Sequence, residues 1–395
     1  MDFKFTPRRI INKLKAITFS KQIGTFTKVP YEKGHYPNGI NYFGHLKSSI
    51  GLGQGSRLYG LSLSKSDIPS CFIDIPLVGV SQSSKFYDIP LSKKPIYSIN
   101  LFHINPENLY ALRNKFNFKI FNYRYNIGTF LWELDIVPQS WLKVLKFFDE
   151  FWVPSNHVKN CLSKVTDKPI KVIPYGMEKI EINKLPSKFN FNGKFTFLTM
   201  FDSKSNIERK NPLMTIDVFK DAFGYFNEVK LVVKANNLTE KDRSLLKEHI
   251  GNHKNIEILD LDLTRNDVYS LIRSSNCLVS LHRAEGFGLT LAEAMSLGVP
   301  VLATAYSSTV DFANEKNSYA VSYKLVPSNV TYQNEQGFSW AEPNFKEAVK
   351  QMLNVYNGYK KEEKLKEAKK TIDTYLSIKH SSSLMVLAYK EIINC

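Results

Sequence analysis

Short apolar runs alternate with amphipathic segments throughout the second half of the chain. The runs at 195–201, 229–235 and 277–282 are rich in Val, Leu and Phe, which is typical of strands buried on both faces. The intervening segments repeat apolar positions every three or four residues, as helices do. Repeated strand–helix units predict a parallel sheet covered by helices. The expected strands are 195–201, 229–235, 256–260, 277–282 and 299–304, and the expected helices are 211–223, 243–250, 265–275 and 289–297.

The first half of the chain alternates in the same way, with less regular spacing. A glycine-rich loop is expected before a helix at 56–64. In 139–155, Trp141, Leu145 and Phe148 fall on one helical face, so this segment is predicted to be a helix. Near the other end of the chain, the acidic and basic segment 345–373 is also predicted to be a helix. The expected strands of this half are 40–44, 70–77, 96–104, 170–177 and part of 118–134.

A polar segment at 178–194 separates the two alternating runs and is predicted to be a linker. The fold class is therefore α/β, with two Rossmann-like domains whose parallel sheets face each other across a cleft. The predicted domains are residues 1–178 and 179–374. Residues 375–395 are predicted to form a C-terminal helix that crosses back to the first domain.

Composition narrows the expected partners and compartment. The chain has 53 Lys and Arg against 37 Asp and Glu, a formal net charge of +16. Such a surplus indicates an anionic partner, such as nucleic acid, acidic lipid or a phosphorylated ligand. The 4 cysteines are far apart, which suits a reducing compartment and argues against a zinc site. Because no signal-peptide h-region and no apolar run of about 20 residues is found, a cytoplasmic protein is expected.

The first residues form a basic segment. Thr6 can cap a helix that has Pro7 at its first position, and Ile10, Leu14 and Ile17 then share one face. Two interpretations stay open. The helix either lies on anionic lipid, which would place the protein on the inner face of the membrane, or packs on the body of the protein.

The sequence RAEGFGLTLAEAMSLG, at 283–298, places two glutamates around a glycine turn. The turn follows an expected strand and precedes an expected helix, and parallel sheets bind ligands at this end of their strands. Its glycines let backbone N–H groups approach an anion, and the helix start adds favourable partial charge. Glu285 and Glu293 can each accept two hydrogen bonds from vicinal hydroxyls. A nucleotide sugar offers a diphosphate and two sets of such hydroxyls.

A second interpretation of the same residues is purely structural. Thr290 and Glu293 match a capping box, in which the glutamate only closes the start of the helix. Glu285 would then be an ordinary loop acid.

The sequence FDSKSNIERKNP, at 201–212, favours the ligand site. It follows the first strand of the second domain, at the same sheet edge. Arg209 and Lys210 can neutralise a diphosphate, the arginine as a fork and the lysine as a point charge. Ser203 and Ser205 offer hydroxyl donors.

The spacing of the two glutamates around Gly-Phe-Gly resembles the retaining glycosyltransferases of family 4, which have the GT-B fold. The resemblance implies that Glu285 contacts the donor sugar and that Glu293 binds the ribose. Phosphate is then expected on the turn that follows the first glutamate, at Phe287, Gly288, Leu289 and Thr290.

The family's basic pair on the diphosphate most nearly matches Lys210, with Arg209 beside it. The usual partner arginine is absent, and Lys204 is the nearest cation in its place. The resemblance also puts the base near the end of a strand, at Asp260 and Leu261.

In the first domain, GLGQGSR resembles the family's glycine-rich loop near the diphosphate and acceptor, which assigns Gly53 and Gln54 to that site. Many family members carry His-Asp where this chain has Trp132-Glu133. Either Glu133 orients the acceptor hydroxyl or His103 substitutes for the missing histidine. The alternatives are a satisfied histidine at a strand end for His103 and core packing for Trp132.

Together these features imply a hexosyltransferase-like enzyme, with an acceptor-side first domain and a donor-binding second domain. It would transfer a sugar from a nucleotide diphosphate sugar to a glycan hydroxyl, with retention. The segments 101–110 and 124–162 resemble a polysaccharide-assembly branch of the family, so the acceptor is expected to be a glycan, with a lipid-linked glycan as one form. No DxD motif stands in a site position, so no metal and no cofactor is expected.

Three other functions remain as alternatives. A nucleotide-sugar epimerase or a phosphorylase can use the same fold. A non-enzymatic basic protein that binds RNA or lipid is the third, but the aromatic and basic signature of an RNA-recognition motif is not found, so no nucleic-acid partner is expected.

Overall fold

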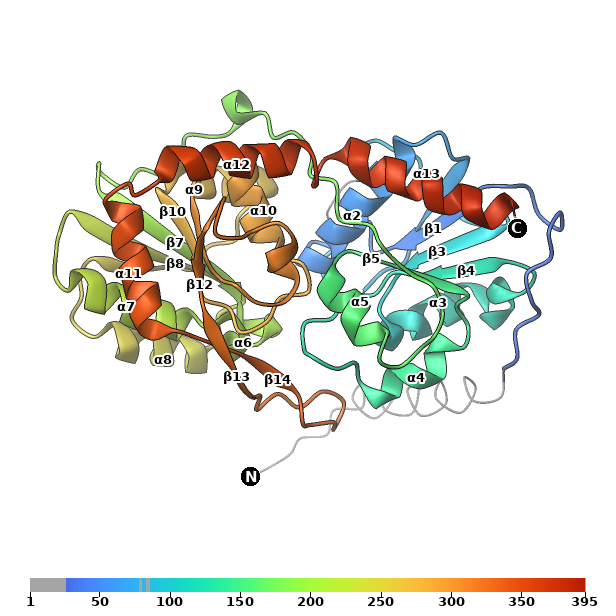
Figure 1. Cartoon of the computed structure of the whole chain (residues 1–395), viewed down its shortest axis with the longest axis horizontal. Helices are drawn as coiled ribbons and strands as arrows, with labels where there is room; N and C mark the ends of the chain where they lie inside the picture. Colours follow the sequence, from blue (N-terminus) through green and yellow to red (C-terminus); the bar gives the residue numbers. More distant parts are fainter. Residues whose placement is uncertain (1–25, 78–79, 83–85, 395) are drawn as a thin grey trace.

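The computed structural model describes residues 26–77, 80–82 and 86–394 (Figure 1). Two six-stranded sheets, one in each half of the chain, account for most of the described strands. All neighbouring strands within these two sheets are parallel, as in β1 with β3 and β7 with β8. The predicted α/β fold with two Rossmann-like domains is therefore confirmed. The basic segment with Thr6, Pro7 and Ile10 lies outside the described residues.

The N-terminal sheet has the strand order β2-β1-β3-β4-β5-β6. Strands β1 and β3 are buried at every residue, as expected for a parallel sheet with helices on both faces. The strands are β1 (Ile40–Gly44), β2 (Ser70–Asp74), β3 (Ile99–His103), β4 (Tyr125–Gly128), β5 (Glu150–Val153) and β6 (Ile170–Val172). The helices are α2 (Gly51–Ser64), α3 (Leu109–Phe116), α4 (Gln139–Leu145) and α5 (Asn156–Leu162).

The C-terminal sheet has the order β12-β11-β10-β7-β8-β9, with β10 and β7 at its centre. The strands are β7 (Phe195–Asp202), β8 (Val229–Asn236), β9 (Ile256–Leu259), β10 (Cys277–Ser280), β11 (Val301–Thr304) and β12 (Tyr319–Val321). The helices are α6 (Ile207–Lys210), α7 (Pro212–Phe223), α8 (Glu240–Ile250), α9 (Arg265–Ser274), α10 (Leu289–Ser296), α11 (Phe345–Tyr356) and α12 (Lys361–Asp373).

The last helix, α13 (Ile378–Asn394), lies on the N-terminal domain beside α2 (Figure 1). Its hydroxyls bind backbone carbonyls of that domain: Ser382 donates to Ser62 and Ser381 to Pro174, both at 2.5 Å. The chain therefore passes between the domains twice, once near 178–194 and once before α13. No helix among the described residues is long and apolar enough to span a bilayer.

Three local predictions were wrong, and one element was missed. The glycines of GLGQG lie in the first turns of α2, not in a loop. Segment 139–155 is not one helix, because α4 ends at Leu145 and the chain then forms β5. Segment 345–373 is broken into α11 and α12 at Gly358, whose φ is +70°. An antiparallel hairpin of β13 (Tyr323–Pro327) and β14 (Ser339–Pro343) was not predicted.

Candidate active site

The two domains meet at the carboxyl ends of their parallel strands. The loop after β4 reaches the loop after β10, so that a Cβ at Gly286 would lie 3.7 Å from Cγ of Glu133. At α5, the hydroxyl of Ser155 donates to that of Ser308 at 2.8 Å. Between these contacts, the ring of Tyr175 packs on that of Phe287, with centroids 4.6 Å apart. This is the sheet edge where ligands of parallel α/β folds bind.

A charged cluster centred on Glu285 lies at this junction, in which Glu285 and Arg209 are buried and Lys210 is partly buried. Lys210 donates a hydrogen bond to Oε1 of Glu285, and a guanidinium nitrogen of Arg209 lies 3.7 Å from the same oxygen. Arg209 also reaches across the domain boundary to Glu133, with an N–O distance of 3.5 Å. The predicted residues Glu285, Lys210, Arg209 and Glu133 are therefore neighbours in space, although Glu133 belongs to the other domain.

Backbone carbonyls hold the guanidinium of Arg209 in place. It donates to the carbonyl oxygen of Ala284 at 2.7 Å and to that of Ser205 at 3.1 Å. Asn206 caps the start of the short helix α6, and its side chain accepts from the N–H groups of Glu208 and Arg209. Ser205, predicted as a hydroxyl donor to the ligand, donates instead to the carbonyl of Asp202 at 2.8 Å.

The cluster shifts the pKa values of its members. Burial opposes ionisation of Glu285, but Lys210 and Arg209 outweigh it and lower its pKa to about 2. Burial lowers the pKa of Lys210, and Arg209 adds to this, while Glu285 acts in the opposite direction. The two cations thus share the buried carboxylate of Glu285, and Arg209 also faces the partly exposed carboxylate of Glu133.

The glycine turn has the geometry expected of an anion-binding loop. Gly288 has φ of +93°, and a Cβ there would lie 2.5 Å from Cγ2 of Thr309, so glycine is required. Gly288 precedes Leu289, the first residue of α10. The first N–H groups of an α-helix have no partner within it and point toward a ligand at its start. The side chain of Phe287 is buried at the domain junction, so only its backbone can serve phosphate.

Glu293 does not cap its helix. The N-cap of α10 is Gly288, and no side-chain cap hydrogen bond is present, so the capping-box interpretation is wrong. Glu293 is buried and forms an ion pair with Arg265, the first residue of α9. Sequence reasoning missed Arg265. The expected helix 265–275 had already placed Arg265 at a helix start, where the structure has a capping box of Thr264 and Asp267, but the pairing of Arg265 with Glu293 was not predicted.

The predicted base site lies at the edge of the sheet. Asp260 pairs with Arg243, and Leu261 is 49% exposed after the edge strand β9. In the described part of the chain, Asp260 forms its ion pair with Arg243 and none with the charged cluster. Asp260 and Leu261 are therefore not brought together with Glu285 by this structure.

Gly53 and Gln54 lie in the first turn of α2. A Cβ at Gly53 would lie 2.2 Å from the carbonyl oxygen of Ser48, so the residue serves close backbone packing. The side-chain oxygen of Gln54 accepts two hydrogen bonds from Arg57, at 2.8 and 3.2 Å. Arg57 in turn donates to the carbonyls of Leu46 and Ser48, so the predicted pair shapes the loop that precedes the helix.

His103 is a satisfied core histidine. Its Nδ1 lies 2.8 Å from the hydroxyl of Ser56, and its Nε2 lies 2.8 Å from that of Tyr175. Burial, together with nearby His45, lowers its pKa to about 3. Glu133, by contrast, is one-third exposed and contacts the charged cluster. The geometry thus favours Glu133 over His103 for an acceptor-side role.

Residues 186–372 match the family model described as glycosyl transferases group 1. The matched segment covers the C-terminal sheet and includes Arg209, Lys210, Glu285 and Glu293. It does not cover the N-terminal sheet. A comparison with curated proteins found no match.

Solved structures, among them glycosyltransferases, share the fold of most of the chain. Anabaena HepE in complex with UDP and glucose is 13% identical, with a TM-score of 0.64 over 90% of this chain and 100% of that chain. A glycosyltransferase from Rickettsia africae is 15% identical, with a TM-score of 0.64 over 90% and 99%. S. aureus TarM is 16% identical, with a TM-score of 0.53 over 75% of this chain but 55% of that chain. The GT-B fold is thereby confirmed.

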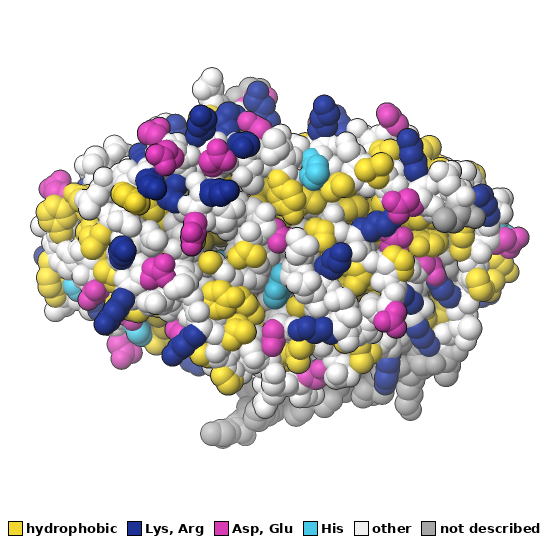
Figure 2. All heavy atoms as spheres, viewed as in Figure 1, with side chains coloured by type: hydrophobic (Ala, Val, Ile, Leu, Met, Phe, Trp, Pro, Cys, Tyr) yellow, Lys and Arg dark blue, Asp and Glu magenta, His cyan; other side chains and the backbone are white. Residues whose placement is uncertain are grey.

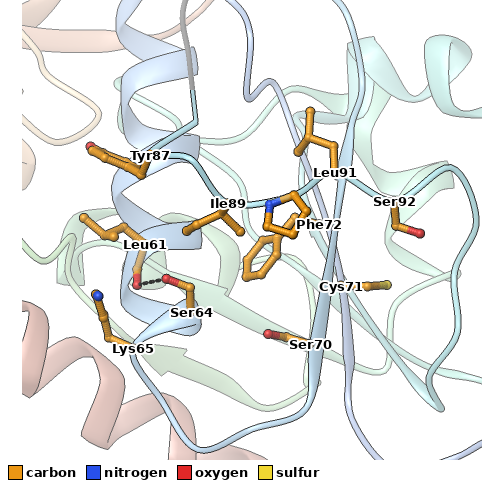
Figure 3. Close-up of a pocket in the computed structure, with 11 residues that line it drawn as sticks. Leu61, Ser64, Lys65, Ser70, Cys71, Phe72, Tyr87, Ile89, Leu91 and Ser92 are labelled. Atoms are coloured by element: carbon orange, nitrogen blue, oxygen red, sulfur yellow. Dashed lines mark hydrogen bonds between the residues drawn. The ribbon is translucent and has the colours of Figure 1, made fainter.

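Two surface hollows lie apart from the charged cluster. One, of about 620 Å³, is lined by α2, β2 and the segment around Ile89, with Lys65 and Cys71 at its sides (Figure 3). The other, of about 680 Å³, lies between α7 and the start of β13. On the face seen in Figure 2, basic and acidic side chains are interspersed. Among the described residues, no group of three His, Cys, Asp or Glu could hold a metal ion.

We expect His103 to make the protein acid-sensitive. The pKa of His103 is about 3 in the folded protein and about 6.5 in an unfolded chain. Unfolding is therefore increasingly favoured as the pH falls from 6.5 toward 3, and the free energy of unfolding should decrease by about 1.4 kcal/mol per pH unit in this range. Urea unfolding at pH 7, 6, 5 and 4 should show a steeper loss for the wild type than for His103→Gln. Parallel pH curves for the two proteins would contradict the expectation.

Proposed function

We propose that the protein is a retaining glycosyltransferase that transfers a hexosyl group from a nucleotide diphosphate sugar to a glycan hydroxyl. The observation that supports it best is the Lys210–Glu285–Arg209 cluster beside the Gly288 turn, where the two domains meet. A diphosphate needs cations and free backbone N–H groups in one place, and this junction offers both.

The proposed chemistry relies on charge stabilisation. The bond between the anomeric carbon and the diphosphate oxygen breaks, and negative charge develops on the leaving group. Lys210, Arg209 and the start of α10 stabilise that charge more in the transition state than in the ground state. The acceptor oxygen bonds to the anomeric carbon on the same face, and its proton passes to the departing phosphate oxygen. Glu285 holds the sugar hydroxyls, and Glu133 orients the acceptor.

A screen of nucleotide sugars by thermal shift tests the proposal. A ligand at 100 times its Kd is expected to stabilise the protein by about 2.7 kcal/mol. The donor that binds is then incubated with the protein, with and without glycan acceptors, and the products are analysed by mass spectrometry and NMR. A parallel reaction that contains EDTA tests the proposed metal independence. Transfer with retention supports the proposal. An epimerised sugar from donor alone, or no stabilisation by any nucleotide diphosphate, would refute it.

The acceptor, the polysaccharide role and the location belong to the same proposal. A glycan, in free or lipid-linked form, is the proposed acceptor, and the cytoplasm or the inner membrane face is the proposed site of action. The net charge of +16 supports an anionic surface as a partner. Sedimentation with vesicles that contain acidic lipid, compared with neutral vesicles, tests this part separately.

Replacing Glu293 with glutamine should weaken nucleotide binding by about 10-fold, because a charged acceptor of ribose hydrogen bonds is lost. Because the substitution also breaks the ion pair between Glu293 and Arg265, Arg265→Gln is the matched control. It breaks the same pair but keeps the carboxylate. Isothermal titration should show weaker binding only for Glu293→Gln. If the two variants bind the nucleotide with equal affinity and show the same loss of melting temperature, Glu293 has only a structural role.

A further inference from the structure

The hairpin of β13 and β14 extends from the C-terminal domain toward the N-terminal domain (Figure 1). Its strands pair from Tyr323 with Pro343 to Pro327 with Ser339, and residues 328–338 form the connection between them. We call residues 323–343 the clasp. The clasp belongs to one domain by sequence, but its far end contacts the other.

Polar contacts fix the far end of the clasp on α4. The carboxylate of Glu335 accepts from the N–H groups of Gln139 and Ser140, the first two residues of α4, at 2.5 and 2.9 Å. These N–H groups have no partner within their own helix, so Glu335 satisfies them from outside. In return, Oδ1 of Asp135 accepts from the N–H of Ser339 at 2.8 Å.

An aromatic group joins the clasp to the segment that bears Glu133. The ring of Trp132 packs edge-on against Tyr332, with centroids 4.9 Å apart, and lies 6.0 Å from Phe338. On its other side it contacts Trp141 of α4, at 5.1 Å. Trp132 is almost fully buried among these rings, so its backbone has little freedom.

The residues on each side of Trp132 are anchored by their own domain. The side chain of Asn105 exchanges two hydrogen bonds with the backbone of Leu131, at 2.9 and 3.0 Å. His157 donates from Nε2 to the carbonyl of Glu133 at 3.0 Å. Trp132, between them, has partners in both domains: its indole N–H donates to the carbonyl of Ile136 at 2.6 Å, and its ring packs on Trp141 on one side and on Tyr332 and Phe338 of the clasp on the other.

We propose that the clasp is a positioning element, which orients Glu133 toward Arg209 by packing Tyr332 against Trp132. The proposal rests on the proposed function and adds to it a group outside the charged cluster. Arg209 and the clasp belong to the same domain, so docking of the clasp and approach of Glu133 to Arg209 occur together. The acceptor side of the site is then complete only when the clasp is docked.

The test compares Tyr332→Ala with Tyr332→Phe, which keeps the ring. Tyr323→Ala is the matched control, because Tyr323 lies in the same hairpin but packs on Tyr306 of its own domain. Hydrogen exchange of peptides that contain Gln139 and Ser140 reports docking without any enzyme assay. Titration with the donor and steady-state kinetics report binding and turnover.

Tyr332→Ala should speed hydrogen exchange at Gln139 and Ser140, because the clasp is no longer held on α4. It should lower kcat about 10-fold and raise the share of donor that is hydrolysed by water, because the acceptor is less well oriented. Its affinity for the donor should be unchanged. Tyr332→Phe should restore kcat. Unchanged exchange in Tyr332→Ala, or faster exchange with unchanged kcat and product ratio, overturns the proposal. If the wild type transfers no sugar at all, the proposed function fails, and the positioning role fails with it. The exchange result then still decides whether the clasp docks.

Discussion

Replacing Lys210 with alanine is expected to lower kcat of sugar transfer by about 100-fold or more, the usual cost of removing one group that stabilises transition-state charge. The ammonium group is partly buried and bonded to Glu285 beside the Gly288 turn, which places its charge at the proposed diphosphate site. Donor affinity should fall less than kcat, because the leaving diphosphate gains charge as the bond breaks. Single-turnover kinetics with saturating donor measures the chemical step directly.

Lys204→Ala is the matched control for this experiment. Lys204 is an exposed lysine in the turn after β7, close to Lys210 in sequence, and its ammonium group forms no ion pair with the described residues of the cluster. Its loss should change kcat by less than about threefold, since an exposed charge in high dielectric contributes little. A large loss for Lys204→Ala would show that it takes the place of the family's missing arginine. An unchanged kcat for Lys210→Ala would remove the lysine from the mechanism.

The charged cluster was predictable because its parts lie next to strand ends. Glu285 and Lys210 are 75 residues apart, yet each follows a strand of one parallel sheet, and β10 and β7 are neighbours in it. A parallel sheet brings the residues after adjacent strands together, whatever their distance in sequence. Periodicity and the position of the glycines therefore sufficed to place them in one site.

Contacts between domains could not be predicted in this way. Whether Arg209 meets Glu133, or the clasp meets α4, depends on how two separate sheets are oriented, which no local pattern encodes. The pair of Arg265 and Glu293 has a similar origin, because it joins two helices through side-chain packing. These contacts extend a cluster in which only Glu285, Lys210 and Arg209, on one sheet, were expected from the sequence to be neighbours.

The error at 139–155 has a different cause. The apolar residues of β5 continue the spacing begun by α4, so the helical pattern extends past Leu145 into a strand. Glu150, which looks like a solvent-facing helix position, is buried in β5. It accepts hydrogen bonds from Trp152 at 2.8 Å and Tyr125 at 3.0 Å, and lies 3.3 Å from Lys171. A buried carboxylate with such partners cannot be recognised from spacing alone.

The largest expected effect on stability follows from replacing Glu285 with glutamine. The substitution leaves the buried Arg209 and the partly buried Lys210 without their shared carboxylate, which should lower the free energy of unfolding by about 3 kcal/mol at pH 7. Urea denaturation measures the loss. Glu342→Gln is the matched control: Glu342 pairs with Arg283 at 2.7 Å, but the carboxylate is 30% exposed, so less than about 1 kcal/mol should be lost.

The pH dependence gives this prediction a second test. The pKa of Glu285 is about 2 in the folded protein and about 4.3 in an unfolded chain, so its contribution is complete above pH 4.3 and is lost as the pH falls toward 2. Wild-type stability should therefore approach that of Glu285→Gln between pH 5 and 3. Adding Lys210→Met to Glu285→Gln should recover part of the loss, because one unpaired charge is removed. A constant difference from pH 7 to 3, with no recovery in the double variant, would mean that Glu285 is not the counter-ion of the cluster.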